Sequence, residues 1–474
     1  MIVFLSSILW AADVDISPED AADIDAAITL LRPGDTLRFT GGTYDVWNWN
    51  FTLNGEEDNP IRIVAEEGCE FVIRTNEEGS YPSRGFYFSE SSFLEIENIQ
   101  LSGDEGWDGE DVSFEGMRFN VVSDISVRNV KIKKTGGASF VLTGDSTRVT
   151  VESSSFSSTR NGTPVVAGCN NLSCYVSDFS FIKNLVHSNN NENHDLIYIY
   201  DGVQNATISD NVLYGSVRNG ITMGHPDNGD PSYIERNVIW NVDNAGFVGR
   251  GPMVVRNNII FNTGGQGMYF SNPGTGYEGI VISFNTVVKT GSYGVELRNW
   301  HEVVGNVFSN NAVCNPVGTS VYFQINEDME TETSGHTIYN NLLCGSVSNL
   351  SETLGHFLLG YGYSDFIDVE GWNFYPSEDS MLLNTADPSG ENFIPEIDFN
   401  GVPRDGAAPE IGAYEWDGAN NPGWQIREGF KTYDLESNVS EEVVSEGCCA
   451  NNDSPEKALV LLPILLLAHR RRRS

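Results

Sequence analysis

The chain has 474 residues, and its 66 acidic against 27 basic side chains give a formal net charge of −39. This charge argues against nucleic acid as a partner, because phosphate binding requires clustered lysines and arginines. It suits a salty or calcium-rich medium, although a merely solvated acidic surface is the simpler explanation. One globular core rarely covers this length, whereas a solenoid can, since each coil contacts only its neighbours.

The N-terminal residues predict an export signal followed by a cap. Residues 1–12 form an apolar run that ends in small residues, and we interpret them as the remnant of a secretory signal peptide. Residues 13–92 are assigned to an N-terminal cap and the first coils. Within them, Ser17-Pro-Glu-Asp20 offers an N-cap, a proline and acids for an amphipathic helix that runs through about Leu31. Such a helix would cover the core and strand edges of a first coil.

A phrase of one apolar residue, two variable positions, an asparagine and an apolar pair recurs in the central chain. Its asparagines are spaced 26, 21, 27 and 21 residues apart: Asn211, Asn237, Asn258, Asn285 and Asn306. A second alternating segment accompanies each phrase, and its inward positions are Ile197, Ile221, Phe247, Met268 and Val295. This period and alternation indicate a β-solenoid rather than helical repeats. We predict coils over residues 93–360, with the asparagines stacked as an internal ladder.

These repeats resemble those of the pectate-lyase-like superfamily of right-handed parallel β-helix proteins, over roughly residues 60 to 360. The resemblance implies an all-β fold: a right-handed parallel β-helix solenoid with an N-terminal capping helix and a C-terminal cap. The superfamily's catalytic motifs do not carry over. Polygalacturonase-like hydrolases have an Asp-Asp pair and a Gly-His-Gly, whereas this chain has no Asp-Asp and only Gly224-His225-Pro226. The Lys-Ser of β-helix alginate and chondroitin lyases is also absent from the sequence.

The C-terminal part is predicted to close the solenoid and to sort the protein. Residues 361–416 are assigned to a C-terminal cap, because Asp398–Arg404 followed by Pro409–Glu415 resembles the closing segment of bacterial surface-anchored β-helices. Residues 417–447 are polar and acidic, as in a linker. Residues 448–474 resemble a sorting tail of the myxobacterial type, with paired cysteines, a short apolar run and terminal arginines. We therefore expect an exported protein at the cell surface or outer membrane, or released from it, that touches a membrane only through this tail.

Two further features suggest metal binding and cross-links. Asp104, Asp108 and Asp111 lie in one loop and could hold Ca²⁺, although the spacing is not that of an EF-hand and the loop is as readily a solvated one. No other cofactor is expected. Disulfides between Cys169 and Cys174 and between Cys314 and Cys344 are plausible in an exported protein, with buried free thiols as the alternative.

The outward residues of the second segments form the candidate site. In register, one row contains Tyr198, Thr222, Val248, Tyr269 and Glu296, and the next contains Tyr200, Gly224, Arg250, Ser271 and Arg298. The strand ends and preceding turns add Asp201, His225, Asn272, Asn299, His194 and Arg218. Aromatic rings beside cations, carboxylates and amides suit an acidic polysaccharide. Cross-strand pairs that merely cover the sheet are the alternative.

A uronic-acid lyase or epimerase needs a cation for the sugar carboxylate, a base for the C5 proton and an acid. Arg250 or Arg298 could be the cation, His225 or His194 the base, and Tyr198 or Tyr269 the acid. Substrate binding is expected from Tyr200, Asp201, Arg218, Asn272, Glu296, Arg298 and Asn299. A glycosidase would need two facing carboxylates, for which Asp201 with Asp227 or Asp230 is the nearest pair. A non-catalytic adhesin or structural surface protein is the alternative of a different class.

Overall fold

The computed structural model describes residues 11–74, 82–104, 114–158, 162–170, 174–188, 194–226, 230–271, 278–300, 305–324, 336–349, 357–387, 394–404 and 408–432. All of them belong to one compact unit, Met1–Asp434. Residues 1–10 of the predicted signal peptide and the whole predicted sorting tail, residues 448–474, lie outside the described residues. Among the described residues, no helix has the length and hydropathy needed to cross a bilayer.

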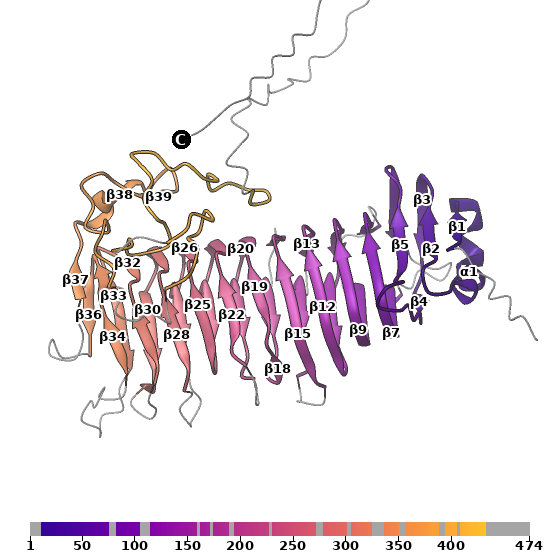
Figure 1. The fold of residues 1–474 in the computed structure, drawn as a ribbon, viewed down its shortest axis with the longest axis horizontal. Helices are drawn as coiled ribbons and strands as arrows, with labels where there is room; N and C mark the ends of the chain where they lie inside the picture. Colours follow the sequence, from indigo (N-terminus) through magenta and orange to yellow (C-terminus); the bar gives the residue numbers. More distant parts are fainter. Residues whose placement is uncertain are drawn as a thin grey trace, which may run out of the picture. The chain divides into compact units, whose positions relative to one another are not determined.

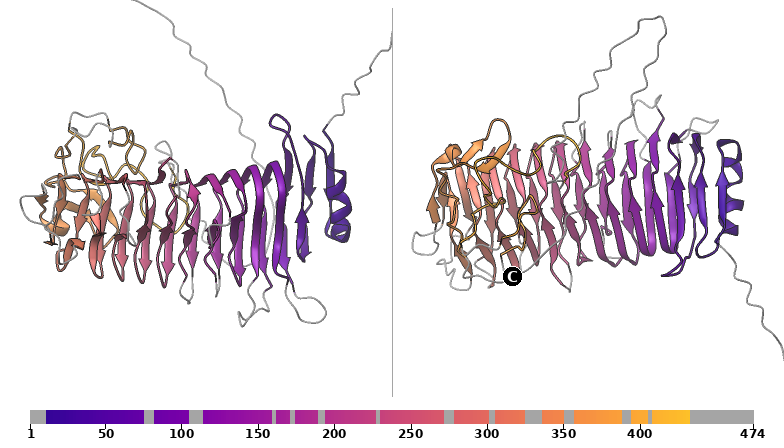
Figure 2. Two further views of the ribbon diagram at one scale, coloured as in Figure 1. Left: turned by 90° about the horizontal axis from the view of Figure 1, so that it is seen from below. Right: turned by 45° about the horizontal axis from the view of Figure 1, so that its top comes forward.

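Each coil consists of three short strands, and each strand pairs in parallel with its counterpart in the next coil (Figures 1 and 2). Sheet 1 contains β4 (Trp49–Phe51), the first part of β7 (Arg84–Glu97) and of β9 (Glu115–Arg128), β11 (Phe140–Thr143), β14 (Val165–Ala167), β17 (Ile197–Ile199), β21 (Ile221–Met223), β24 (Phe247–Gly249), β27 (Met268–Phe270), β30 (Tyr293–Arg298), β33 (Thr319–Gln324) and β36 (Ser346–Ser348). The predicted parallel β-solenoid is therefore confirmed, with one more strand in each coil than the two that the repeats indicated.

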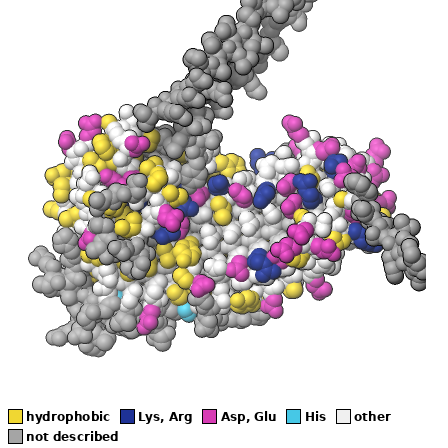
Figure 3. Space-filling model, in the orientation of Figure 1, with side chains coloured by type: hydrophobic (Ala, Val, Ile, Leu, Met, Phe, Trp, Pro, Cys, Tyr) yellow, Lys and Arg dark blue, Asp and Glu magenta, His cyan; other side chains and the backbone are white. Residues whose placement is uncertain are grey.

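Sheet 2 is continuous with sheet 1, because β7 and β9 run through both. It contains β1 (Asp13–Ile16), β2 (Thr36–Phe39), β5 (Ile61–Ala65), β12 (Ser146–Glu152), β15 (Val176–Ile182), β18 (Val203–Gln204), β19 (Thr207–Ser209), β22 (Ser232–Glu235), β25 (Met253–Arg256), β28 (Ile280–Ser283), β31 (Val307–Ser309) and β34 (Thr337–Tyr339). Its outer surface carries cross-strand ion pairs such as Arg62 with Glu97 at 3.1 Å and Arg256 with Glu235 at 2.6 Å. Figure 3 shows acidic and basic side chains lying side by side in this way.

Sheet 3 closes each coil after the turn that carries the repeated asparagine. It contains β3 (Gly42–Val46), β6 (Cys69–Ile73), β8 (Gln100–Gly103), β10 (Lys131–Thr135), β13 (Ser155–Ser158), β16 (Leu185–Ser188), β20 (Val212–Ser216), β23 (Val238–Val242), β26 (Ile259–Thr263), β29 (Thr286–Thr290), β32 (Ala312–Cys314), β35 (Asn341–Leu343) and β37 (Phe357–Leu359).

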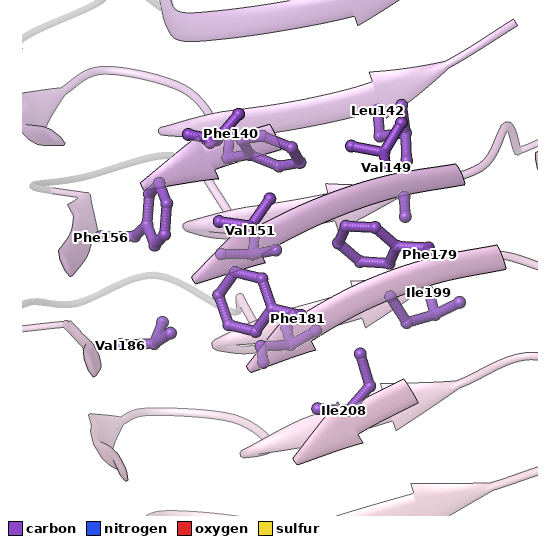
Figure 4. Close-up of a cluster of buried hydrophobic side chains, with 14 of the residues drawn as sticks. Phe140, Leu142, Val149, Val151, Phe156, Phe179, Phe181, Val186, Ile199 and Ile208 are labelled. Atoms are coloured by element: carbon purple, nitrogen blue, oxygen red, sulfur yellow. The ribbon is translucent and has the colours of Figure 1, made fainter. Parts of the chain in front are cut away.

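The interior is a continuous apolar column, because alternate residues of all three sheets point inward. Figure 4 shows one section of this column, in which Phe140, Phe156, Phe179 and Phe181 meet. The first coils are rich in aromatic rings, and Phe88 stacks on Phe51 and on Phe119 with centroids 4.7 Å apart in both pairs. Later coils have mostly aliphatic residues and methionine at the same positions, with a few phenylalanines such as Phe247 and Phe270.

The N-terminal helix is confirmed as a cap, in two parts. A 3₁₀ turn, η1 (Pro18–Asp23), leads directly into α1 (Ile24–Leu30). Ser17 Oγ donates to Asp20 Oδ2 at 2.6 Å, which fixes the start of the 3₁₀ turn. Ile24, Ala27 and Ile28 are buried in the same cluster as the first coil, so the helix covers the end of the core.

The asparagine ladder is confirmed, with one correction. From Asn237 onward, each ladder asparagine accepts the backbone N–H and the side-chain NH₂ of the preceding one, as in Asn258 Oδ1 with Asn237 N and Nδ2, both at 3.0 Å. The ladder runs through Asn184, Asn211, Asn237, Asn258, Asn285, Asn311 and Asn341. The residue before each is left-handed, for example Asp210 at φ 59°, which tightens the turn.

The prediction that Asn306 belongs to this ladder is wrong. Asn306 lies before β31 and accepts the N–H of Ile280 at 3.0 Å, whereas the ladder position follows that strand at Asn311. The coil contains an asparagine on each side of β31, and the repeat pattern selected the earlier one. The true spacing from Asn285 to Asn311 is the same 26 residues as from Asn211 to Asn237.

Residues 360–432 differ from the expected order of cap and linker. This C-terminal segment includes η3 (Gly362–Asp365) and the antiparallel pair β38 (Phe366–Asp368) and β39 (Asn373–Pro376). It lies along the outer surface of sheet 3, where Trp372 contacts both Trp240 and Phe261. Trp424 and Ile426 are buried in the same cluster, so the first part of the predicted linker, residues 417–447, is packed.

A buried arginine attaches this segment to the ladder turns. Arg404 donates to Glu415 Oε2 at 2.7 Å, to the carbonyl oxygen of Gly412 at 2.7 Å and to Asn257 Oδ1 at 3.2 Å. Asp398 orders the same region by accepting the N–H groups of Asn400 at 2.7 Å and Glu415 at 2.7 Å. The two sequence motifs therefore form one hydrogen-bonded unit against the side of the solenoid.

Both predicted disulfides are present. Cys169 and Cys174 are joined within one turn, and Cys314 and Cys344 join neighbouring coils of sheet 3. Cys69 is a buried free thiol whose Sγ lies 3.3 Å from the carbonyl oxygen of Phe39.

Candidate functional site

The outward row on sheet 1 has the register that the sequence predicted. Tyr198 pairs with Thr222, Thr222 with Val248, Val248 with Tyr269 and Tyr269 with Glu296. The row continues to Tyr322 on β33. Their inward neighbours are all buried: Ile197, Ile199, Ile221, Met223, Phe247, Met268, Phe270, Val295 and Leu297. Burial on one side of each strand is what holds the outward side chains in these rows.

At one end of the face, two tyrosines and an arginine lie together. The Tyr198 and Tyr200 rings have centroids 4.6 Å apart, and both side chains are partly exposed. Burial raises the pKa of the Tyr198 phenol, and the positive charge of Arg250 opposes that rise. Tyr198 therefore stays protonated at neutral pH. Arg250 is partly buried and forms no ion pair with any carboxylate in the described parts of the chain.

Between Tyr200 and Arg250, the outward row contains a glycine, which leaves room for the neighbouring side chains. Gly224 follows β21 in the row that also contains Tyr200 and Arg250, and a methyl group there would approach Asp201 Oδ1 to 2.7 Å. The backbone N–H of His225 donates to the same oxygen, Asp201 Oδ1, at 2.9 Å. The imidazole of His225 lies against Gly251, so this histidine and Arg250 are close neighbours on consecutive coils. Tyr198, Tyr200, Arg250, Asp201 and His225 thus form one group, which we call the Tyr198 group.

At the other end, the charged residues satisfy one another. Arg298 Nε donates to Glu296 Oε1 at 2.5 Å, and Gln266 Nε2 donates to the other carboxylate oxygen at 2.6 Å. The guanidinium of Arg298 lies 4.8 Å from the ring centroid of Tyr269. Glu296 is fully buried, and Arg298 is its ion-pair partner. Among the described residues, Arg298 and Tyr269 therefore resemble the cross-strand pairs of the alternative interpretation more than a free binding surface.

A buried aspartate beside the Tyr198 group was not singled out from the sequence. Asp195 is 1% exposed, and Arg218 Nε lies 3.5 Å from its Oδ1. Burial raises the pKa of the Asp195 carboxyl, against the effect of a Thr222 hydrogen bond and the Arg218 charge. The only sequence signal was an acid directly before the buried Leu196. His194 precedes it, and its carbonyl oxygen accepts from Ser216 Oγ at 2.8 Å.

Several predicted residues remain as predictions. Asn272, Asp227, Asp108 and Asp111 lie outside the described residues. Asp104 is partly buried, with its Oδ1 3.4 Å from Arg74 Nη1. No group of three metal-ligating side chains occurs among the described residues, and Ca²⁺ binding stays a prediction. Asp201 and Asp230 are exposed, and Asn299 is partly exposed at a left-handed φ of 56°.

The fold and the rows on sheet 1 define a parallel β-helix protein with a polar and aromatic face. No family model matches the sequence, and no curated protein does. Among solved structures, a mutant of the PL6 family alginate lyase AlyGC matches with a TM-score of 0.50 and 16% identity, over 73% of this chain and 53% of the lyase. This chain thus spans about half of that enzyme.

Two further structures match with lower scores. Pectate lyase Pel9A gives a TM-score of 0.47 and 14% identity, over 87% of this chain and 98% of its own. The A-module of mannuronan C-5 epimerase AlgE4 from Azotobacter vinelandii gives 0.47 and 13%, over 72% and 92%. At 16% identity, the likeness to AlyGC shows the fold alone, a parallel β-helix as predicted.

Proposed function

We propose that this protein binds an acidic polysaccharide along sheet 1, and that the Tyr198 group contacts the sugar units. The observation that supports this most is Arg250, a partly buried guanidinium beside two tyrosines and without a carboxylate partner among the described residues. A uronate carboxylate would supply that partner in a charge-assisted hydrogen bond, while the tyrosine rings would stack on sugar rings. The similar fold of an alginate lyase makes alginate the first polysaccharide to test, by fold-level analogy.

The same group has the residue types for cleavage or epimerisation. Neutralising the uronate carboxylate with Arg250 would acidify the C5 proton. His225, whose imidazole lies against Gly251 beside Arg250, would accept that proton. Tyr198, a protonated phenol, would donate the proton to the leaving oxygen or to the opposite face of C5. Lyase activity would give an unsaturated uronate, whereas epimerisation would give none.

The test compares Arg250→Ala and Tyr198→Phe with Arg148→Ala, which removes an exposed arginine on sheet 2. Binding to alginate, pectin and glycosaminoglycans is measured by affinity electrophoresis, and product by ultraviolet absorbance and by NMR of the sugar. We expect Arg250→Ala to weaken binding at least about tenfold, since a hydrogen bond to a charged group contributes roughly 1.5–3 kcal/mol. Unchanged binding and activity in Arg250→Ala would place the site elsewhere.

A non-catalytic adhesin is the second candidate, and the Glu296–Arg298 pair favours it. Over that part of sheet 1 the charges satisfy one another, as they do in a surface that only covers a sheet. An adhesin would retain acidic glycans without forming any product. We also propose that the protein is exported and held at the cell surface through residues 448–474; deletion of these residues should release it into the medium, as fractionation would measure.

A further inference from the structure

Sheet 3 carries a pocket of about 320 Å³ near its N-terminal end, far along the chain from the Tyr198 group. Its floor is formed by β6, β8 and β10, and includes Val72, Leu101 and Ser102. Lys131, Lys133, Lys134 and Arg74 surround it. Four cations at one pocket are unexpected in a chain of net charge −39, and three of them are among only seven lysines in the sequence.

A local distortion of β10 brings the three lysines to one side. Alternation along a strand would turn Lys133 and Lys134 to opposite faces. Lys134 instead has a φ of 56°, and the register with β13 shifts between Ile132 and Thr135, as in a β-bulge. Gly103 accommodates the bulge, since a methyl group there would lie 2.2 Å from the carbonyl oxygen of Lys134. A left-handed lysine costs about 1–2 kcal/mol.

The lysines are available to a ligand. Lys131 and Lys133 are exposed, and neither forms an ion pair with a described residue. Arg74 is held by Asp45 at 2.5 Å and by Asp104 at 3.4 Å, so it forms a wall of the pocket more than a free charge. Glu70 also lines the pocket and limits its excess positive charge.

The C-terminal segment leaves this part of sheet 3 open. Its apolar contacts with the sheet begin at Leu185 of β16 and extend to the last coils. Figure 2 (right) shows the orange and yellow segment over that half of the solenoid, while the strands from β6 to β13 have no described element above them. The open strands from β3 to β10 span about 14 Å, taking about 4.8 Å per strand.

We propose that this pocket is a second saccharide-binding site, which holds the carboxylate or sulfate groups of an acidic oligosaccharide with Lys131, Lys133 and Lys134. Val72 would contact the apolar face of a sugar ring, and Ser102 and Gln100 its hydroxyls. The choice of an acidic saccharide rests on the proposed function of sheet 1. The site would anchor one part of a chain whose other part lies on sheet 1, or a second chain.

The experiment titrates the full chain with trigalacturonate in an isothermal calorimeter, with maltotriose as an uncharged control and inorganic phosphate as a simple anion. The variant is Lys131→Ser with Lys133→Ser, and the matched control is Lys183→Ser, which removes a lysine from the turn after β15. We expect the double variant to lose affinity at least about tenfold and the Lys183 variant to bind as the parent does. Circular dichroism confirms that each variant is folded.

The outcomes separate this site from the Tyr198 group. If Arg250→Ala removes all trigalacturonate binding while the double lysine variant keeps it, the pocket proposal is overturned and the sheet 1 proposal stands. If the lysine variant loses binding and Arg250→Ala does not, the pocket is supported and the Tyr198 group is not. Phosphate that binds as tightly as trigalacturonate would reduce the pocket to an anion site and overturn its assignment to saccharide.

Discussion

Sheet 3 has two different surfaces on one continuous backbone. One outward row runs from Val72, Ser102 and Lys133 near the N-terminus, through Ser157 and His187, to Tyr214, Trp240, Phe261 and Val288. The C-terminal segment covers the apolar and aromatic stretch and leaves the polar stretch open. The left-handed residue of β10, Lys134, has equivalents in the covered stretch at Asn241 and Asn262, so backbone geometry does not distinguish the two. The outward side chains therefore decide which stretch is covered and which can meet a ligand.

The turns between sheets 2 and 3 also differ between the covered and the open coils. The covered coils have the asparagine ladder from Asn184 onward, whereas the equivalent turn positions of earlier coils hold Ile99, Val130 and Ser154. Ser154 is intermediate, because its Oγ accepts the N–H of Val130 at 3.0 Å and its own N–H donates to Asn184 Oδ1 at 2.8 Å. Hydrogen bonds therefore stabilise the turns of the covered half, and apolar contacts stabilise those of the open half.

The largest expected effect comes from breaking the ladder. Asn258→Ala removes the acceptor of Asn237 N and Nδ2 and the donor to the carbonyl oxygen of Ile234, all buried. We expect a loss of about 3–5 kcal/mol in the free energy of unfolding, because buried donors are left without partners. Asn306→Ala, outside the ladder, should cost about 1 kcal/mol. Urea unfolding measures both, and equal losses would contradict the ladder assignment.

Arg404→Met tests how the covering segment is held. It leaves the partly buried Glu415 without its cation, and we expect the segment to be destabilised by about 3 kcal/mol. Limited proteolysis between residues 408 and 432 should become faster while the coils remain folded. Arg427→Met changes an exposed arginine of the same segment and should stay within about 0.5 kcal/mol of the parent. Equal cleavage rates in the two variants would show that Arg404 does not attach the segment.

The stability of the covered half should depend on pH, because the segment that covers it contains a buried lysine. Lys431 is fully buried against Asp210, with its Nζ 3.0 Å from Oδ1, and burial lowers its pKa to about 8 from 10.5. Between these two values the unfolded chain binds more protons, so stability should rise with pH from 8 to 10.5, by on the order of 2 kcal/mol. Lys431→Met should remove this increment from thermal unfolding measured across that range. An identical pH profile in the variant would exclude Lys431 as its source.

The smallest effect is expected on the open stretch. Lys133→Ala changes an exposed side chain that forms no ion pair with a described residue. Its free energy of unfolding should stay within about 0.5 kcal/mol of the parent. A loss above 1 kcal/mol in chemical unfolding would mean that this lysine stabilises the fold, and would weaken the comparison between the two stretches.

Local periodicity was enough to predict the coils, the register of the sheet 1 rows and the capping helix. Those features depend on residues one coil apart or less, whose alternation is visible in the chain. Asn311 was missed because two asparagines flank β31, and pattern matching could not tell which one follows the strand. The lateral position of residues 360–432 depends on contacts such as Arg404 with Asn257, 147 positions apart, which no local pattern reveals.

The sequence predicted the register of the outward rows at the candidate site, but not which charged side chains form ion pairs with one another. Spacing placed Tyr198, Tyr269 and Glu296 correctly in one outward row, with Tyr269 and Glu296 as direct neighbours. It could not show that Arg298 is neutralised by Glu296 while Arg250 has no described carboxylate partner, because side-chain direction at strand ends is set by the turns. The lysine pocket was missed for a similar reason, since alternation predicts that Lys133 and Lys134 face opposite ways.

The disulfide between Cys314 and Cys344 has a mechanical consequence. A solenoid pulled from one end unwinds coil by coil, because each coil is held only by its neighbours. This bond joins two successive coils near the C-terminal end and closes a loop of 30 residues between them. Unwinding under tension from the C-terminus would therefore release less chain than the sequence contains, and the coil inside the loop could not be drawn out until the bond is reduced.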